Sequence, residues 1–351
     1  TAKSFHIRKI TPRHRRPIVR HRAGRRQRRR LVQNIPVGGQ RPQNVGTDLI
    51  AFAVARGARL QGEPAAVEMS IFQREIAIAS LSEVLQEAKK NNYAIAGLVV
   101  LGWEDARCYA ETAEELKVPV ILQAGPGCRA NTPLPVLGKM FRYLAEQSSS
   151  PIVCHLDHGY TKEECLEAID NGFTSVMFDG SKLSLNENVD KTREIVELAH
   201  EQNISVEGEI GFVGYNDGAK SQSTDPEEAK TFAELTKCDA MAISAGNVHL
   251  QTNKSSSIDM QVIKKIETLT EVPLVLHGSS GIDDTLKRTI ANTTNVCKFN
   301  IGTELRKTFG DTLREEIVKD PNTYDRIKLI NSTIPKLKEV TKKVLENISK
   351  I

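Results

Sequence analysis

The chain has 351 residues with a formal net charge of +4, and 39% of its residues are hydrophobic against 26% that are charged. This composition is ordinary for a globular protein, and no run of about 18 consecutive apolar residues predicts a transmembrane helix. The N-terminus also lacks the apolar centre of a secretory signal. We therefore expect a cytoplasmic protein without a membrane partner.

The first 47 residues differ from the rest in charge. They carry twelve Arg and two Lys without an acid, a local charge of +14, so the remaining residues sum to −10. The stretch RHRAGRRQRRRLVQ allows an RNA-binding arm, but the segment has few aromatic residues to stack on bases. The alternative is a segment foreign to the domain, from a wrong gene start or a fusion. We expect residues 1–79 to be a disordered or non-native extension, and we expect no nucleic-acid partner.

From Ser80 onward, short apolar β-rich runs alternate with longer amphipathic runs. A first helix is predicted over residues 80–92. Strands are predicted at residues 93–100, 118–123, 152–156, 175–178, 205–210, 240–244, 274–277 and 296–300. Helices between them include residues 104–116, 133–147, 162–172, 186–203 and 226–236. Eight β-then-α units predict a closed (β/α)8 TIM barrel over residues 80–351; an open doubly wound sheet is the alternative, without its Gly-rich fingerprint.

Most histidines in this regular part stand where predicted strands end. Three of the eight histidines lie in the basic segment, and four of the other five fall in the motifs CHLDHG, SAGNVHL and LVLHGSSG. Because the carboxyl ends of barrel strands meet at one rim, His158, His249 and His277 are expected to present ring nitrogens to one point. Three neutral imidazoles with one open position are the pattern of a catalytic zinc site. Such an ion would polarise a carbonyl and stabilise the enolate that forms when a neighbouring bond breaks.

Asp157 precedes His158 in the sequence and is the expected proton carrier, close to the metal without binding it. Residues two apart on a strand share a face, so Asp157 is grouped with His155, while His158 turns into the following loop. The alternative role for Asp157 is to hold the second ring N–H of a ligand. His155 is expected to pack or to support a ligand rather than to bind the metal.

Two further carboxylates, Glu207 and Glu209, share a face of the fifth predicted strand. Inward carboxylates need positive charge nearby, and Glu209 is expected to approach the ion or orient a ligand because it lies nearer the rim. We count it with the metal-site residues. The polar loop that follows, GFVGYNDGAKSQSTDP, is long enough to form a lid. Asp217 in this loop is a candidate second acid/base, with a solvated turn residue as the alternative.

Gly-Ser-rich turns follow the last two predicted strands, in the motifs HGSSG and NIGT. Turns at this place in a barrel offer backbone N–H groups and hydroxyls to an anion, so the substrate is expected to carry phosphate. Ser279 and Ser280 are the candidates in the first turn, and Asn300 and Thr303 supply matching groups in the second. The alternative is that the two serines only cap the next helix.

The motifs CHLDHG, EGEIG, GNVH, LHGSSG and NIGTELR occur together in an order that resembles the class II, metal-dependent ketose-bisphosphate aldolases. The resemblance covers residues 80–303 and extends more weakly to the end of the chain. It implies zinc on the three histidines, and Asp157 handling the proton of the C4 hydroxyl during retro-aldol cleavage. It further implies a monovalent cation, a role in carbohydrate metabolism such as glycolysis, and a homo-oligomer, either a dimer or a tetramer. The implied contacts of the dihydroxyacetone phosphate group are Gly278, Ser280, Asn300 and Thr303.

Several positions depart from the pattern of that family. Gly125 stands near the place of a substrate-binding Ser, Gly302 near that of an Asp, and Leu250 replaces a Gly after the metal-binding histidine. The first predicted strand also lacks the usual Asn. These changes keep the cleavage chemistry and leave the sugar open, so the expected substrate is fructose 1,6-bisphosphate or a related phosphorylated ketose. A Schiff-base aldolase that uses Lys298 or Lys182 is the rival enzyme.

Overall fold

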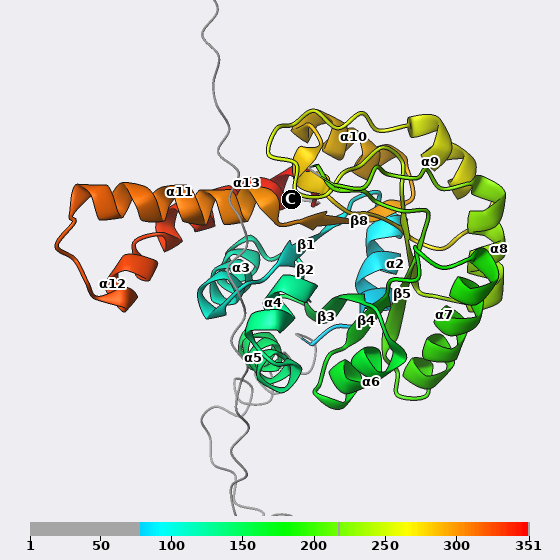
Figure 1. Ribbon diagram of the computed structural model, residues 1–351, viewed down its shortest axis with the longest axis horizontal. Helices are drawn as coiled ribbons and strands as arrows, with labels where there is room; N and C mark the ends of the chain where they lie inside the picture. The colour runs from blue at the N-terminus through cyan, green and yellow to red at the C-terminus, as the bar shows by residue number, and fades with distance from the viewer. Residues whose placement is uncertain (1–77, 217, 350–351) are drawn as a thin grey trace, which may run out of the picture. The chain divides into compact units, whose positions relative to one another are not determined.

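The computed structural model describes residues 78–216 and 218–349. Within this part of the chain, eight parallel strands close into a barrel in which each strand pairs with the next and β8 pairs with β1 (Figure 1). The strands are β1 (Ile95–Val99), β2 (Val120–Ala124), β3 (Ile152–Gly159), β4 (Ser175–Phe178), β5 (Ser205–Ile210), β6 (Ala240–Ile243), β7 (Leu274–Leu276) and β8 (Val296–Ile301). The expected (β/α)8 fold is confirmed, and the open sheet is excluded because the strands close on themselves.

Strand β3 extends further than predicted. Its pairing with β4 passes from Leu156↔Val176 to Gly159↔Phe178, so β3 contains one extra residue, a β-bulge. His158 lies within this bulge with φ 53. The prediction that His158 belongs to the loop beyond the strand is therefore wrong. A period of two in the sequence cannot reveal an inserted residue, which is why the strand was predicted to end at Leu156.

Most of the helices cover the outside of the barrel. The helices of the described residues are α2 (Leu81–Asn91), α3 (Trp103–Leu116), α4 (Pro126–Asn131), α5 (Leu134–Gln147), α6 (Lys162–Asp170), α7 (Leu185–His200), α8 (Pro226–Thr236), α9 (Met260–Glu267), η1 (Ser279–Gly281), α10 (Asp284–Thr293), α11 (Thr303–Lys319), α12 (Arg326–Asn331) and α13 (Ile334–Ile348). The predicted helices agree within three residues at each end. Figure 1 shows α11 running away from the barrel toward α12, and α13 packs beside it on the return.

Helix α2 closes the amino end of the barrel. Ser80 and Glu83 form a capping box at its start, which satisfies backbone N–H groups of the first turn. Its buried face, which includes Leu81 and Leu85, packs with inward-pointing strand residues such as Ile121. Because apolar side chains fill this end, polar chemistry is confined to the opposite end, where the strands finish.

The predicted extension, residues 1–79, lies almost wholly outside the described residues. Its last two residues are described and join the barrel: Ile78 pairs with Ile152, and the Ala79 N–H donates to the Ile152 carbonyl at 3.1 Å. All six cysteines are free and buried, and burial raises the pKa of Cys154 to about 12. No helix among the described residues is long and apolar enough to cross a membrane.

Candidate metal centre and active site

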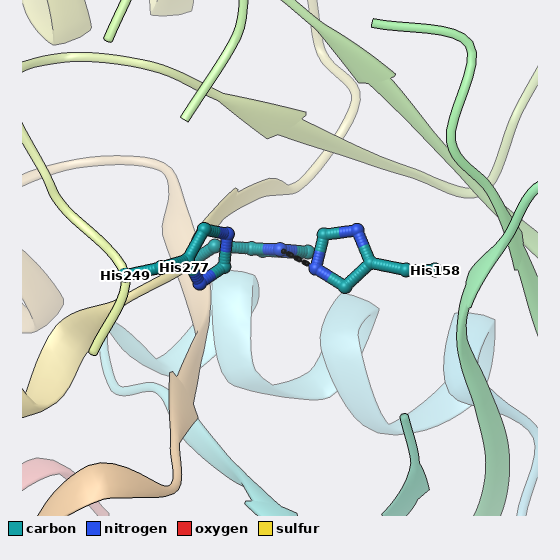
Figure 2. Close-up of side chains that lie close together, drawn as sticks. All are labelled: His158, His249 and His277. Carbon is teal, nitrogen blue, oxygen red and sulfur yellow. Dashed lines mark hydrogen bonds between the residues drawn. The ribbon is translucent and has the colours of Figure 1, made fainter. Parts of the chain in front are cut away.

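Three histidines meet at the carboxyl end of the barrel. His158 is the second-last residue of β3, His249 lies in the loop after β6, and His277 follows β7 directly (Figure 2). The ring centroid of His158 lies 5.3 Å from that of His249 and 4.7 Å from that of His277. One nitrogen from each ring lies within 4.8 Å of the other two, a spacing that allows all three to bind one metal ion. The structure thus brings these residues together; that they bind a metal stays a prediction.

Carboxylates hold one nitrogen of two of these rings. His158 Nδ1 lies 2.8 Å from Asp179 Oδ2, and His277 Nε2 lies 2.9 Å from Glu207 Oε1. The other nitrogens, His158 Nε2 and His277 Nδ1, face each other at 3.0 Å (dashed in Figure 2). A carboxylate that accepts one ring N–H fixes the tautomer and leaves the lone pair of the second nitrogen for a metal. The donor set therefore fits a zinc ion.

Burial and neighbouring charges separate the pKa values of the three rings. Burial lowers the pKa of His277 well below its usual value and that of His249 to about 4, so both are neutral at neutral pH. Burial also opposes the charged form of His158, but Asp157 and further carboxylates outweigh it and raise its pKa to about 9. A divalent cation among the rings would replace the proton of His158, because imidazole binds metals in its neutral form.

Glu207 belongs to a buried ion pair beneath the histidines. Its Oε2 lies 2.5 Å from Lys298 Nζ, which is also 3.3 Å from His155 Nε2. All of these side chains are fully buried. Glu207 thus orients a ring of the cluster, and the expected approach of Glu209 to the ion stays a prediction. Lys298 is held as an ion-paired cation that does not line the cavity, which disfavours its use as a Schiff-base nucleophile.

Glu209 lies on the far side of His158 from the other two rings. Its Oε2 is 3.6 Å from His158 Nδ1 and has no hydrogen-bond partner among the described residues. Burial raises its pKa to about 8. With Asp179 it forms a second group of possible ligand atoms around His158. Sequence reasoning missed Asp179, although the residue directly follows β4 and the same strand-end rule would have found it.

Asp157 lines the cavity beside the histidines. Its Oδ1 accepts a hydrogen bond from Asn300 Nδ2 at 3.1 Å. Burial raises its pKa, but cationic groups, His158 first among them, outweigh burial and lower the pKa, so the carboxylate is ionised at neutral pH. The alternative task, holding a ligand N–H, falls instead to Asp179 and Glu207. Asp217, the candidate second acid/base, lies outside the described residues.

The cavity above the histidines has a volume of about 240 Å³. Four of the five predicted substrate-binding residues line it, namely Gly278, Ser280, Asn300 and Thr303. Ser279 does not: it is fully buried, and its hydroxyl donates to the Leu276 carbonyl at 2.7 Å. Helix α11 starts at Thr303 on the cavity wall, so its N-terminal backbone N–H groups favour an anion there.

Two lining residues were not found from sequence. Arg306, one turn into α11, lines the cavity, and the described residues show no ion pair between its guanidinium and a carboxylate. The ring of Tyr215 stacks on the ring of His249, with centroids 5.0 Å apart. The backbone N–H of His249 donates to the Gly214 carbonyl at 2.8 Å. The long loop after β5 therefore supports one of the histidines. Neither residue type carries a sequence signal for such a contact.

The chain is similar in sequence and in fold to known proteins. The sequence profile described as "Fructose-bisphosphate aldolase class-II" matches residues 79–350. The "Fructose-bisphosphate aldolase" of Geobacillus stearothermophilus is 36% identical over 263 residues, which cover 73% of this chain and 91% of that protein. A "6-phospho-5-dehydro-2-deoxy-D-gluconate aldolase" of Bacillus licheniformis is 36% identical over 279 residues, covering 76% and 93%. The crystal structure of the YdjI aldolase from Escherichia coli K12 superposes with a TM-score of 0.67 at 29% identity, covering 78% of this chain and 97% of that one.

Proposed function

We propose that this chain, which belongs to the class II fructose-bisphosphate aldolase family, binds zinc through its three rim histidines and reversibly cleaves a phosphorylated ketose. The products would be dihydroxyacetone phosphate and an aldehyde. As a member of this family the chain is an aldolase, a carbon–carbon lyase. The single observation that carries the proposal is that His158, His249 and His277 lie within metal-binding distance of one another, with His158 and His249 lining one cavity together with the ionised Asp157.

The chemistry of the donor set supports zinc. Three imidazoles are neutral ligands, and a bound zinc ion supplies Lewis-acid polarisation of the ketose carbonyl. Asp179 and Glu207 hold the outward nitrogens of His158 and His277, so these two rings are oriented before any metal binds. We also expect a monovalent cation near the phosphate, by analogy with the family.

Asp157 is assigned the proton of the C4 hydroxyl. Asn300 donates a hydrogen bond to Oδ1 of Asp157. Residue 125 is a glycine, so the space beside Oδ2 stays open; a Cβ at this position would lie 3.1 Å from that oxygen. As Asp157 takes the proton, the C3–C4 bond breaks and the aldehyde leaves. The electron pair of the broken bond remains on C3 of the three-carbon fragment. A second acid must then protonate C3, and Asp217 remains the candidate for this step.

The phosphate of the three-carbon fragment is assigned to the turns after β7 and β8. Gly278, Ser280 and Thr303 line that side of the cavity, next to the N-terminus of α11. Ser280 already uses its hydroxyl to accept the Glu304 N–H at 3.3 Å, so it contributes chiefly by its remaining O–H. Ser279, whose hydroxyl is bound to a backbone carbonyl, is assigned a role in shaping the turn.

Arg306 favours a second anionic group at the aldehyde end of the substrate. A Cβ at Gly302 would lie 3.6 Å from Arg306 Nη2, so an acidic side chain at that position would sit against the guanidinium. With Gly302 the guanidinium is left to a phosphate or a carboxylate. This supports two substrate classes: a ketose bisphosphate, or a ketose monophosphate that carries a carboxylate, as the name of the Bacillus licheniformis relative describes.

The test is metal content by mass spectrometry of the purified chain, combined with cleavage assays before and after chelation. Fructose and tagatose 1,6-bisphosphates and 6-phospho-5-dehydro-2-deoxy-D-gluconate are the substrates. About one zinc per chain and chelator-sensitive release of triose phosphate are expected. A folded protein without metal would overturn the three-histidine assignment, and a product trapped by borohydride on Lys298 would favour the Schiff-base route.

Two properties of the whole protein belong to the same proposal. We propose a homo-oligomer, a dimer or a tetramer, and a cytoplasmic location, both by analogy with the family. Light scattering on the eluting peak of a sizing column measures the oligomer, and a monomer at micromolar concentration would count against it.

A further inference from the structure

Arg129 is a buried cation just below the rim of the cavity. It lies in α4, directly after β2, and only 8% of its side chain is exposed. It does not line the cavity. Its guanidinium instead contacts the backbone of two strand ends: Nη1 donates to the carbonyls of Ala124 at 2.7 Å and Asp157 at 2.6 Å, and Nη2 donates to the carbonyl of His158 at 2.9 Å.

These contacts fall on the irregular part of β3. In a regular strand consecutive side chains point to opposite faces, so Asp157 and His158 could not both face one cavity. Both line it here because the β-bulge inserts a residue and His158 takes φ 53, a left-handed conformation that is strained for a residue with a Cβ. At this turn the His158 backbone N–H donates to the Met177 sulfur, at 3.4 Å.

Glu164 completes the contact from α6. Its Oε1 accepts from Arg129 Nε at 2.9 Å, and its Oε2 accepts the Tyr160 N–H at 2.9 Å. The chain is thus held at the carbonyl of His158 and again two residues later. The carboxylate also compensates the buried guanidinium, which without a partner would be costly to bury. Arg129 and Glu164 therefore form hydrogen bonds with the backbone within the bulge and just after it.

We infer that Arg129 and Glu164 are positioning residues for this active site: they hold the bulge of β3 so that Asp157 and His158 face the cavity together. The inference rests on the proposed function, in which one residue takes a proton and the other binds the metal. Only a guanidinium presents donors in several directions in one plane, as the three carbonyls and the carboxylate require. A lysine at the same position keeps the charge but cannot span all four acceptors.

The test compares Arg129→Lys and Glu164→Gln with the parent chain. Arg193→Lys, which alters an exposed ion pair with Asp190 on α7, is the matched control. Zinc affinity is measured by competition with a chromophoric chelator, coordination by the visible absorption of the cobalt-substituted protein, and kcat and KM by triose phosphate release. Melting of the metal-free chain reports stability separately.

For Arg129→Lys, zinc affinity is expected to fall at least about tenfold with an altered cobalt spectrum, as for other residues that support metal ligands. The kcat should fall at least about tenfold as Asp157 shifts, while KM should change less than about threefold, because the phosphate-binding turns lie on β7 and β8. Glu164→Gln should fall between Arg129→Lys and the parent, and Arg193→Lys should match the parent.

Parent-like zinc affinity, spectrum and kcat in folded Arg129→Lys, with only a lower melting temperature, would overturn the inference, because a purely structural role predicts that result. If Arg129→Lys does not fold, the same readouts on Glu164→Gln decide. A parent chain that binds no zinc would overturn the proposed function, and with it this role. A parent that binds zinc beside unchanged variants would overturn the positioning role alone.

Discussion

Asp157 differs from the neighbouring carboxylates in its hydrogen-bond partner. Asp179 and Glu207 each accept from a histidine ring, whereas Asp157 accepts from the amide of Asn300. The cationic groups around it lower its pKa, and its second oxygen faces the cavity. An ionised carboxylate with a free oxygen beside the metal site suits a proton acceptor better than a structural anchor.

Asp157→Asn should therefore remove activity without removing the metal. The amide has the same shape but cannot take a proton, so kcat should fall about 10²–10⁴-fold while zinc stoichiometry is unchanged. The measurement is kcat together with zinc content. Asp179→Asn is the contrast, because it should weaken zinc binding by releasing His158. An Asp157→Asn enzyme within threefold of the parent would mean that another group is the base.

The ion pair of Glu207 and Lys298 carries a second prediction at this scale. Glu207→Gln leaves the fully buried Lys298 ammonium without its carboxylate, which should destabilise the metal-free protein by about 3–5 kcal/mol in urea unfolding. Adding Lys298→Met should restore much of this loss, since no buried charge remains. Lys162→Met, in an exposed pair, should change little. Full stability of the single variant would show that Lys298 sheds its proton in the fold.

At the scale of elements, the active site depends on the irregular ends of strands rather than on their regular parts. The bulge of β3 turns His158 toward the cavity, and Gly278 after β7 takes φ 61. A Cβ at Gly278 would lie 2.3 Å from the Val248 carbonyl, directly before His249. The glycine thus lets two strand ends approach closely enough for their histidines to meet.

Gly278→Ala should disturb both the backbone and the metal site. The left-handed φ alone costs about 1–2 kcal/mol for alanine, and the clash with Val248 should displace His249 and weaken zinc binding. Urea unfolding and chelator competition measure the two effects. Gly310→Ala inside α11, where the nearest heavy atom is 3.6 Å away, should leave zinc binding unchanged and stabilise by up to about 1 kcal/mol. Unaltered zinc affinity in Gly278→Ala would show that the loop of His249 adapts.

Across the molecule, the interior of the barrel is polar toward the carboxyl ends of the strands and apolar at the amino end, which α2 closes. Its histidines are kept neutral by burial: the pKa of His155 and of His277 is lowered well below 6.5, and that of His249 to about 4. His158 is the exception, raised to about 9. These groups tie the stability of the metal-free fold to pH in two different windows.

The three lowered histidines predict acid sensitivity. Below about pH 6.5 these histidines are protonated in the unfolded chain but stay neutral in the folded chain. Their contribution to the free energy of unfolding is therefore full above that pH and is lost as the pH falls toward 4. The loss is up to about 1.4 kcal/mol per proton and pH unit. His158 has the opposite effect: its contribution to the free energy of unfolding is full below pH 6.5 and is lost as the pH rises through about 9. Urea midpoints of the metal-free protein should peak near pH 6.5. A flat profile between pH 5 and 7 would contradict this, and His249→Ala should reduce the acid slope.

Much of the fold could be predicted because strand and helix periods are local. The runs that became β4 and β5 were placed to the residue, and His158, His249 and His277 were placed at strand ends that a barrel must gather at one rim. The bulge of β3 could not be predicted, because it depends on the pairing with β4 rather than on any pattern within the strand.

The barrel, the rim histidines and the family could be inferred from the chain alone, because hydrophobic periods and motif order are properties of the sequence. Which carboxylate binds which histidine ring became clear only from the folded structure. Asp179, Glu207 and Arg129 lie far from their partners in sequence, and their assignments to His158, His277 and the β3 bulge are set by packing between strands. Charge pairing inside a core depends on distances of a few ångströms, and those distances exist only after the barrel has closed.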